Sequence, residues 1–227
     1  MGVWKVLTEK MWDAIVEQRL ELHKLLQQLS PEQWRTPSLC QGWSVQDVAA
    51  HVISAPQLGA SSMIKLMPSM LRHGYNGMTL RDGQARGSAS TPAILEQYEQ
   101  FASIRRGPWM VNVKETLTDT LVHFQDLARP LGIEHTMPAE AAVVVAQRLE
   151  RTGLMLGSRK VLRSVSMIAT DINFESGIGE PVIGPISELV MLRAGRSPRW
   201  DTLAGPGVAT VRELREKRAA KAGDIET

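Results

Sequence analysis

The sequence of 227 residues has little of several features that would point to a particular class of protein. Its single cysteine, Cys40, excludes an intramolecular disulfide and any zinc cage built from cysteines. Aromatic residues make up 5%, and 26 Lys and Arg against 24 Asp and Glu leave a formal charge of only +2, so no nucleic-acid partner is expected. The longest uninterrupted aliphatic run, residues 141–146, is far shorter than the roughly 18 residues of a membrane span.

What is present is the balance of an ordinary globular chain, with 43% hydrophobic and 22% charged residues. The first eighteen residues carry charges throughout and lack the apolar stretch of a signal peptide. We therefore expect a cytoplasmic protein with no membrane partner.

Hydrophobic residues at three- and four-residue intervals predict amphipathic helices over the first 130 residues. In the first helix Trp4, Leu7 and Met11 begin an apolar stripe, and Arg19 lies off it. Ser30 begins a short helix.

Ser44, with Asp47 three residues later, has the pattern of a capping box. It begins a predicted helix that runs along the chain towards Arg72. Residues 74–90, with four glycines, are predicted to be a loop. Further helices are predicted from Thr91 and over residues 113–128.

Beyond Pro138 the pattern changes from helical to mixed. A helix over 139–156 is followed by an apolar, β-branched segment at 164–174, a short strand at 182–184 and a helix from Pro185 to Leu192. The predicted fold class is α+β. An antiparallel four-helix bundle spans residues 1–134, a small α+β domain 135–210 and a charged tail 211–227.

Two of the five histidines stand where a metal site could form. Asp119 and His123 are four residues apart on one predicted helix, so both side chains project from the same face. His51 lies two turns into another helix, and bundle helices can bring it opposite that pair. Two histidines and one carboxylate leave an open position on a divalent ion. The alternatives are a solvated Asp–His pair and a hydrogen-bonded core histidine.

The other titratable candidates have simpler interpretations. His23, His73 and His135 are interpreted as structural or solvent-facing. Cys40 has no His or Asp close in sequence, so we interpret it as a small buried hydrophobe. Trp43 is interpreted as a packing anchor at the entry to its helix.

Three stretches of the chain together resemble one family. The segment from Cys40 to His51 fits the pattern Cys-x-Gly-Trp-x-Val-x-Asp-x-x-x-His of the DinB/YfiT-like superfamily, in the branch typified by mycothiol-dependent maleylpyruvate isomerase. Two further stretches are similar to that branch's second metal motif and to its smaller domain, namely residues 119–132 and the segments 169–171, 184–185 and 194–196.

The resemblance implies a metal site and names its ligands. In that family a four-helix bundle holds a divalent ion, usually zinc, and the corresponding residues here are His51, Asp119 and His123. The chain departs from the pattern at Asp119, where the relatives have Glu or His, and the shorter carboxylate is expected to reach less far. Asp126 would hold the second ring nitrogen of a ligand histidine, or else be a surface residue. Arg196 would offer a guanidinium to an anionic substrate, or else be exposed to solvent.

The same resemblance implies a function. A cationic site holds a low-molecular-weight thiol as thiolate, and the family uses mycothiol or a similar thiol as cosubstrate. The thiolate attacks a small electrophile, which gives S-transfer or cis–trans isomerisation. Two alternatives stay open: a metal-dependent hydrolase with the same ligands, and a non-catalytic binding or dimerisation module. A homodimer is one assembly that such a bundle allows.

Overall fold

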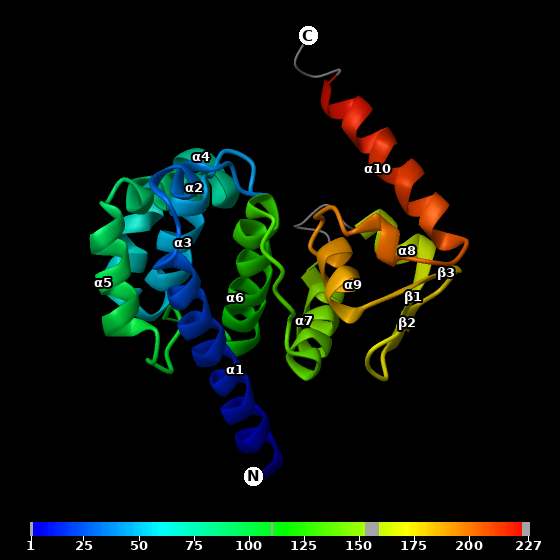
Figure 1. Cartoon of the computed structure of the whole chain (residues 1–227), viewed down its shortest axis with the longest axis horizontal. Coiled ribbons are helices and arrows are strands. Elements are labelled where there is room, and N and C mark those ends of the chain that lie inside the picture. Colours follow the sequence, from blue (N-terminus) through cyan, green and yellow to red (C-terminus); the bar gives the residue numbers. More distant parts are fainter. Residues whose placement is uncertain (1, 110, 153–158, 224–227) are drawn as a thin grey trace. The chain divides into compact units, whose positions relative to one another are not determined.

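The computed structural model describes residues 2–109, 111–152 and 159–223, which divide into two compact units, Met1–His135 and Thr136–Thr227 (Figure 1). The described part of the first unit is helical: α1 (Gly2–Leu26), α2 (Pro31–Arg35), α3 (Val45–Ser54), α4 (Ala60–Gly87), α5 (Thr91–Phe101) and α6 (Val113–Ala128). Helix α1 packs against α5 and α6, and α3 packs against α4, α5 and α6. The predicted number of four helices in the bundle is not confirmed, because α4 is a further long helix that packs on α3.

The second unit combines helices with a small sheet, which confirms the α+β class. Its elements are α7 (Ala139–Thr152), α8 (Arg159–Ser164), β1 (Val165–Ala169), β2 (Glu175–Gly177), β3 (Glu180–Gly184), α9 (Ile186–Arg193) and α10 (Gly207–Gly223). The sheet order is β2-β1-β3, with β1 antiparallel to β2 and parallel to β3. The ends of the predicted helix 139–156 and of the predicted tail 211–227 lie outside the described residues.

Among the described helices, none combines the length and hydropathy that a bilayer-spanning segment requires.

Residues 74–87 form the second half of α4, so the predicted loop at 74–90 is wrong. Gly74 alone leaves helical geometry, with φ 68° and ψ 178°, and kinks the helix. Glycine is required at positions 83 and 87 because α4 lies so close to other residues there that a larger side chain would not fit. A Cβ atom at Gly83 would be 2.3 Å from Cζ2 of Trp43, and one at Gly87 would be 2.8 Å from the Cα of Asp47. Tertiary packing therefore overrides the poor helix propensity of these glycines.

The predicted apolar stripe of α1 is wrong in its first two turns. Trp4 and Leu7 are 74% and 44% exposed, because the start of the helix extends beyond α5 and α6, whereas Ile15 and Leu22 are fully buried as expected (Figure 1). Arg19, predicted on the polar face, is also fully buried. Its Nη1 donates to the carbonyl of Ile104, and burial lowers the pKa of Arg19 to about 10.

The helices that carry the candidate ligands begin where the sequence predicts. The side chain of Ser44 accepts from the backbone N–H of Asp47, whose Oδ2 accepts from the backbone N–H of Ser44, so the expected capping box is present. Helix α6 spans the predicted residues, and the Asn112 side chain caps it. These fixed starts place His51 in the second turn of α3, and Asp119 and His123 one turn apart on α6.

Candidate metal centre

Helices α3 and α6 bring the three predicted ligands together. His51 Nε2 lies 3.2 Å from Asp119 Oδ1, and His123 Nε2 lies 3.3 Å from the same oxygen. The two imidazole rings meet edge to face with centroids 5.1 Å apart, and all three ligand atoms lie within 4.8 Å of one another. The carboxylate of Asp119 therefore reaches both histidines despite its short side chain.

The cluster is partly buried, and Trp43 covers it from the start of α3. The side chains of His51, Asp119 and His123 are 18%, 31% and 14% exposed. The ring of Trp43 lies 4.9 Å from that of His51 and 5.9 Å from that of His123, and its Nε1–H donates to the carbonyl of Leu80 in α4. The predicted packing anchor thus packs on the candidate ligands themselves, and it links them to α4.

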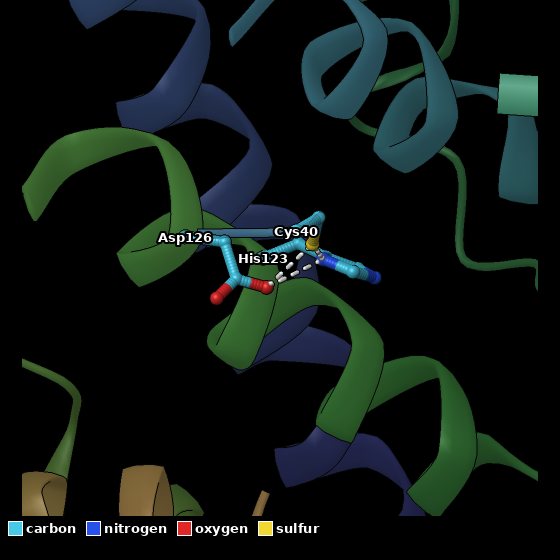
Figure 2. Close-up of side chains that lie close together, drawn as sticks. All are labelled: Cys40, His123 and Asp126. Carbon is cyan, nitrogen blue, oxygen red and sulfur yellow. Dashed lines mark hydrogen bonds and ion pairs between the residues drawn. The ribbon is translucent and has the colours of Figure 1, made fainter. Parts of the chain in front are cut away.

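The second nitrogen of His123 lies in a separate hydrogen-bonded cluster with Asp126 and Cys40 (Figure 2). Asp126 is completely buried, and its Oδ2 lies 2.9 Å from His123 Nδ1. The thiol of Cys40 donates to the same oxygen at 3.0 Å, with Sγ 3.4 Å from Nδ1.

The interpretation of Cys40 as a residue that only packs is therefore wrong. Sequence reasoning missed its role because 83 residues separate Cys40 from His123 and 86 separate it from Asp126. The available signal was its place in the same short motif as His51.

The two histidines are held differently. A carboxylate only accepts hydrogen bonds, so in the metal-free protein His123 donates through Nδ1–H to Asp126 and through Nε2–H to Asp119. By contrast, Nδ1 of His51 is buried without a hydrogen-bond partner among the described residues. The His51 ring is held by packing against Trp43 and by Asp119 at one nitrogen, whereas the His123 ring has a carboxylate at each nitrogen.

Charge is strongly coupled within this cluster. Burial alone would raise the pKa of Asp119, but the imidazoles of His51 and His123 outweigh it and hold that pKa well below its ordinary value. Burial alone would lower the pKa of His123, but the charges and hydrogen bonds of Asp119, Cys40 and Asp126 together outweigh it and raise that pKa well above 6.5. Without a metal ion, Asp119 and His123 therefore form an ion pair.

Comparison with known proteins assigns the first unit. The family model described as the mycothiol maleylpyruvate isomerase N-terminal domain matches residues 16–128. The N-terminal unit belongs to this family. The match includes both motifs that carry the candidate ligands, and it agrees with the DinB-like superfamily indicated by the sequence.

Solved structures extend the likeness to the fold of most of the chain. It is similar to the crystal structure of the mycothiol-dependent maleylpyruvate isomerase, with a TM-score of 0.60 and 14% identity over 88% of this chain and 92% of that one. A histidine-to-alanine variant of that isomerase matches with a TM-score of 0.59 and 13% identity over the same shares. No curated protein sequence gives a significant match.

The donor set of this N-terminal unit fits a divalent ion. Two imidazole nitrogens and one carboxylate oxygen are ligands of catalytic zinc sites, which keep the fourth position open. Tetrahedral zinc with bonds of about 2.0–2.1 Å requires ligand atoms roughly 3.3 Å apart. The two N–O separations, 3.2 and 3.3 Å, agree with that value.

Because Asp119 and His123 form an ion pair, the stability of the metal-free domain should depend on pH. Because the pKa of His123 is raised, its contribution is complete below pH 6.5 and is lost as the pH rises through the raised value. Because the pKa of Asp119 is lowered, its contribution is complete above pH 3.8 and is lost as the pH falls through the lowered value. Denaturant titrations with a chelator should therefore show stability falling as the pH rises above 6.5. In Asp119→Asn this fall should be smaller. Parallel curves of stability against pH for the variant and the wild type would contradict the prediction.

Arg196, the remaining predicted site residue, belongs to the second unit. Helix α9 ends at Arg193, Gly195 follows with φ 75°, and Nη1 of Arg196 donates to the carbonyl of Ala194. Its role towards an anionic substrate stays a prediction.

Proposed function

We propose that this protein binds one divalent cation, zinc by analogy with the family, through His51, Asp119 and His123, and uses it with a low-molecular-weight thiol of the mycothiol type. The reaction would be S-transfer to a small electrophile, or its cis–trans isomerisation. The observation that carries the proposal is the convergence of three ligand atoms from α3 and α6 on one point, with Asp119 Oδ1 3.2 and 3.3 Å from the two histidines. The family match and the similarity to a mycothiol-dependent isomerase support it.

A bound divalent ion would lower the pKa of the thiol and favour the reactive thiolate. The residues of the chain would orient the ligands and limit access of water. Asp126 accepts from Nδ1–H of His123, which leaves Nε2 directed at Asp119. Trp43, only 6% exposed, packs against both histidine rings in a tilted arrangement.

The experiment is a metal analysis followed by a thiol titration. Protein purified without chelator should contain close to one equivalent of a divalent metal, and chelation should remove it. In the metal-loaded protein, mycothiol at about 100 times its Kd should stabilise the fold by roughly 2.7 kcal/mol, and glutathione at the same concentration is the control. Isomerisation of maleylpyruvate and thiol conjugation of a small electrophile are then assayed with and without mycothiol.

The alternatives give different results. Stoichiometric metal with thiol-independent hydrolysis of esters or amides would favour a metal hydrolase. Less than about a tenth of an equivalent of metal, without recovery on reconstitution, would contradict both enzymes and leave a binding or dimerisation module. We also propose a cytoplasmic location.

A further inference from the structure

The buried carboxylate of Asp126 connects a cysteine to a candidate metal ligand. Two donors lie on one oxygen, Oδ2: the thiol of Cys40 at 3.0 Å and Nδ1 of His123 at 2.9 Å (Figure 2). We propose that Cys40 is a positioning residue for the metal centre, which acts through Asp126 to hold His123 in the orientation and tautomer that bind a cation through Nε2. This inference rests on the proposed metal site.

The first support is the backbone that carries Cys40. The segment from Thr36 to Ser44 folds back on itself, because the Ser38 N–H donates to the Trp43 carbonyl and the Val45 N–H to the Thr36 carbonyl. The N–H of Leu39 donates to the carbonyl of Asp126 at 2.9 Å. Cys40 is therefore held beside α6 by the main chain, one residue from a hydrogen bond to Asp126 itself.

The second support is the fixed direction of the cysteine. Its own N–H donates to Ser38 Oγ at 3.1 Å, and Ser38 Oγ lies 3.3 Å from the Cys40 carbonyl and 2.9 Å from the Trp43 carbonyl. Hydrogen bonds thus order the turn on both sides of the thiol, which limits how far it can move from Asp126.

The third support is the chemistry of Asp126. A carboxylate that is 0% exposed needs donors, because burial of an unsatisfied charged group is costly. Cys40 and His123 both supply donors to Oδ2. A thiol that donates to the same oxygen limits the movement of the carboxylate away from Nδ1–H of His123. Outer partners of this kind affect metal affinity by about 10- to 100-fold.

The test compares three substitutions by their affinity for Co²⁺, titrated into the metal-free protein. Asp126→Asn should weaken binding by about 10- to 100-fold. Cys40→Ala, which removes the donor, should weaken it by about tenfold, within the same range. Cys40→Ser keeps a donor at the same position, and its affinity should remain within about threefold of the wild type, since the hydroxyl can make the same bond.

Two measurements separate positioning from general stability. Denaturant unfolding of the metal-free variants shows how much stability each substitution removes, and a positioning role requires that affinity follow the presence of the donor rather than this loss. Long-range ¹H–¹⁵N spectra of the imidazoles at a pH where His123 is neutral should show Nδ1–H in the wild type and Cys40→Ser, and a mixture of tautomers in Cys40→Ala.

Three outcomes would overturn the proposal. The first is equal Co²⁺ affinity for Cys40→Ala and the wild type. The second is weakened binding in Cys40→Ser equal to that in Cys40→Ala. The third is a thiolate-to-cobalt charge-transfer band in the wild type that Cys40→Ser lacks, because Cys40 would then be a ligand. If the wild type itself binds no divalent metal, the proposed function fails, and the tautomer spectra still test the link between Cys40 and His123.

Discussion

His51→Ala and His123→Ala are each expected to abolish tight binding of the divalent cation. Each removes one of three protein ligands that lie within 4.8 Å of one another. The loss of affinity should exceed the roughly 100-fold upper range for outer partners. Isothermal titration of the chelated protein with Zn²⁺ measures it directly.

The two variants should differ in stability, because the histidines are held differently. His123→Ala removes a donor from the buried Asp126, and leaving a buried group without a partner costs about 1–3 kcal/mol. His51→Ala removes a partner only from Asp119, whose side chain is 31% exposed and keeps its contact with His123. His51→Ala is therefore the cleaner test of metal binding.

The exposed His73 in α4 supplies the matched control. His73→Ala should keep the wild-type affinity for Zn²⁺. If His51→Ala folds normally and still binds one equivalent of Zn²⁺ at wild-type affinity, the assignment of the metal centre is incorrect.

Gly83→Val is expected to lower the free energy of unfolding by about 3 kcal/mol, in the upper part of the range for overpacked cores. A Cβ atom at Gly83 would be 2.3 and 2.5 Å from Cζ2 and Cε2 of Trp43. The indole has little room to move, because it is buried and its Nε1–H is bonded to the Leu80 carbonyl. Chemical denaturation followed by circular dichroism measures the loss.

The same substitution should weaken metal binding, since a displaced Trp43 no longer supports the ring of His51. Ala85→Val is the control: it introduces the same β-branched side chain at an exposed position of α4. Helix propensity alone should cost it about 0.5 kcal/mol. Equal effects of the two substitutions would contradict the role of the contact with Trp43, because helix propensity alone favours Val over Gly.

The positions of His51, Asp119 and His123 on their helices were predictable because their signals are local. A capping box at Ser44 fixes the start of α3, and the i, i+4 spacing places Asp119 and His123 on one face of α6. Whether His51 on α3 comes close to Asp119 and His123 on α6 depends on how the helices pack. The sequence implied this packing only through the predicted bundle. The short side chain of Asp119 still reaches both histidines. The distance between α3 and α6, and not the length of the side chain alone, decides whether a carboxylate reaches them.

Three of the wrong predictions share a cause, because each depends on a neighbour that is distant in sequence. The glycines of residues 74–87 favour a loop until Trp43 and Asp47 are known to lie against Gly83 and Gly87. Cys40 has no partner nearby in the chain, yet Asp126 lies 3.0 Å away in the fold. Arg19 fits a polar helix face, but α5 and α6 enclose it.

The connection before α3, residues 36–44, has a consequence for which parts of the sequence can change among members of the family. It begins the helix that carries His51, and its Leu39 is bonded to Asp126 in the helix that carries His123. The spacing between the two histidines is therefore governed by a few adjoining residues more than by the outer surfaces of the helices. Those surfaces are free to accumulate substitutions, which accords with a shared fold at 14% identity.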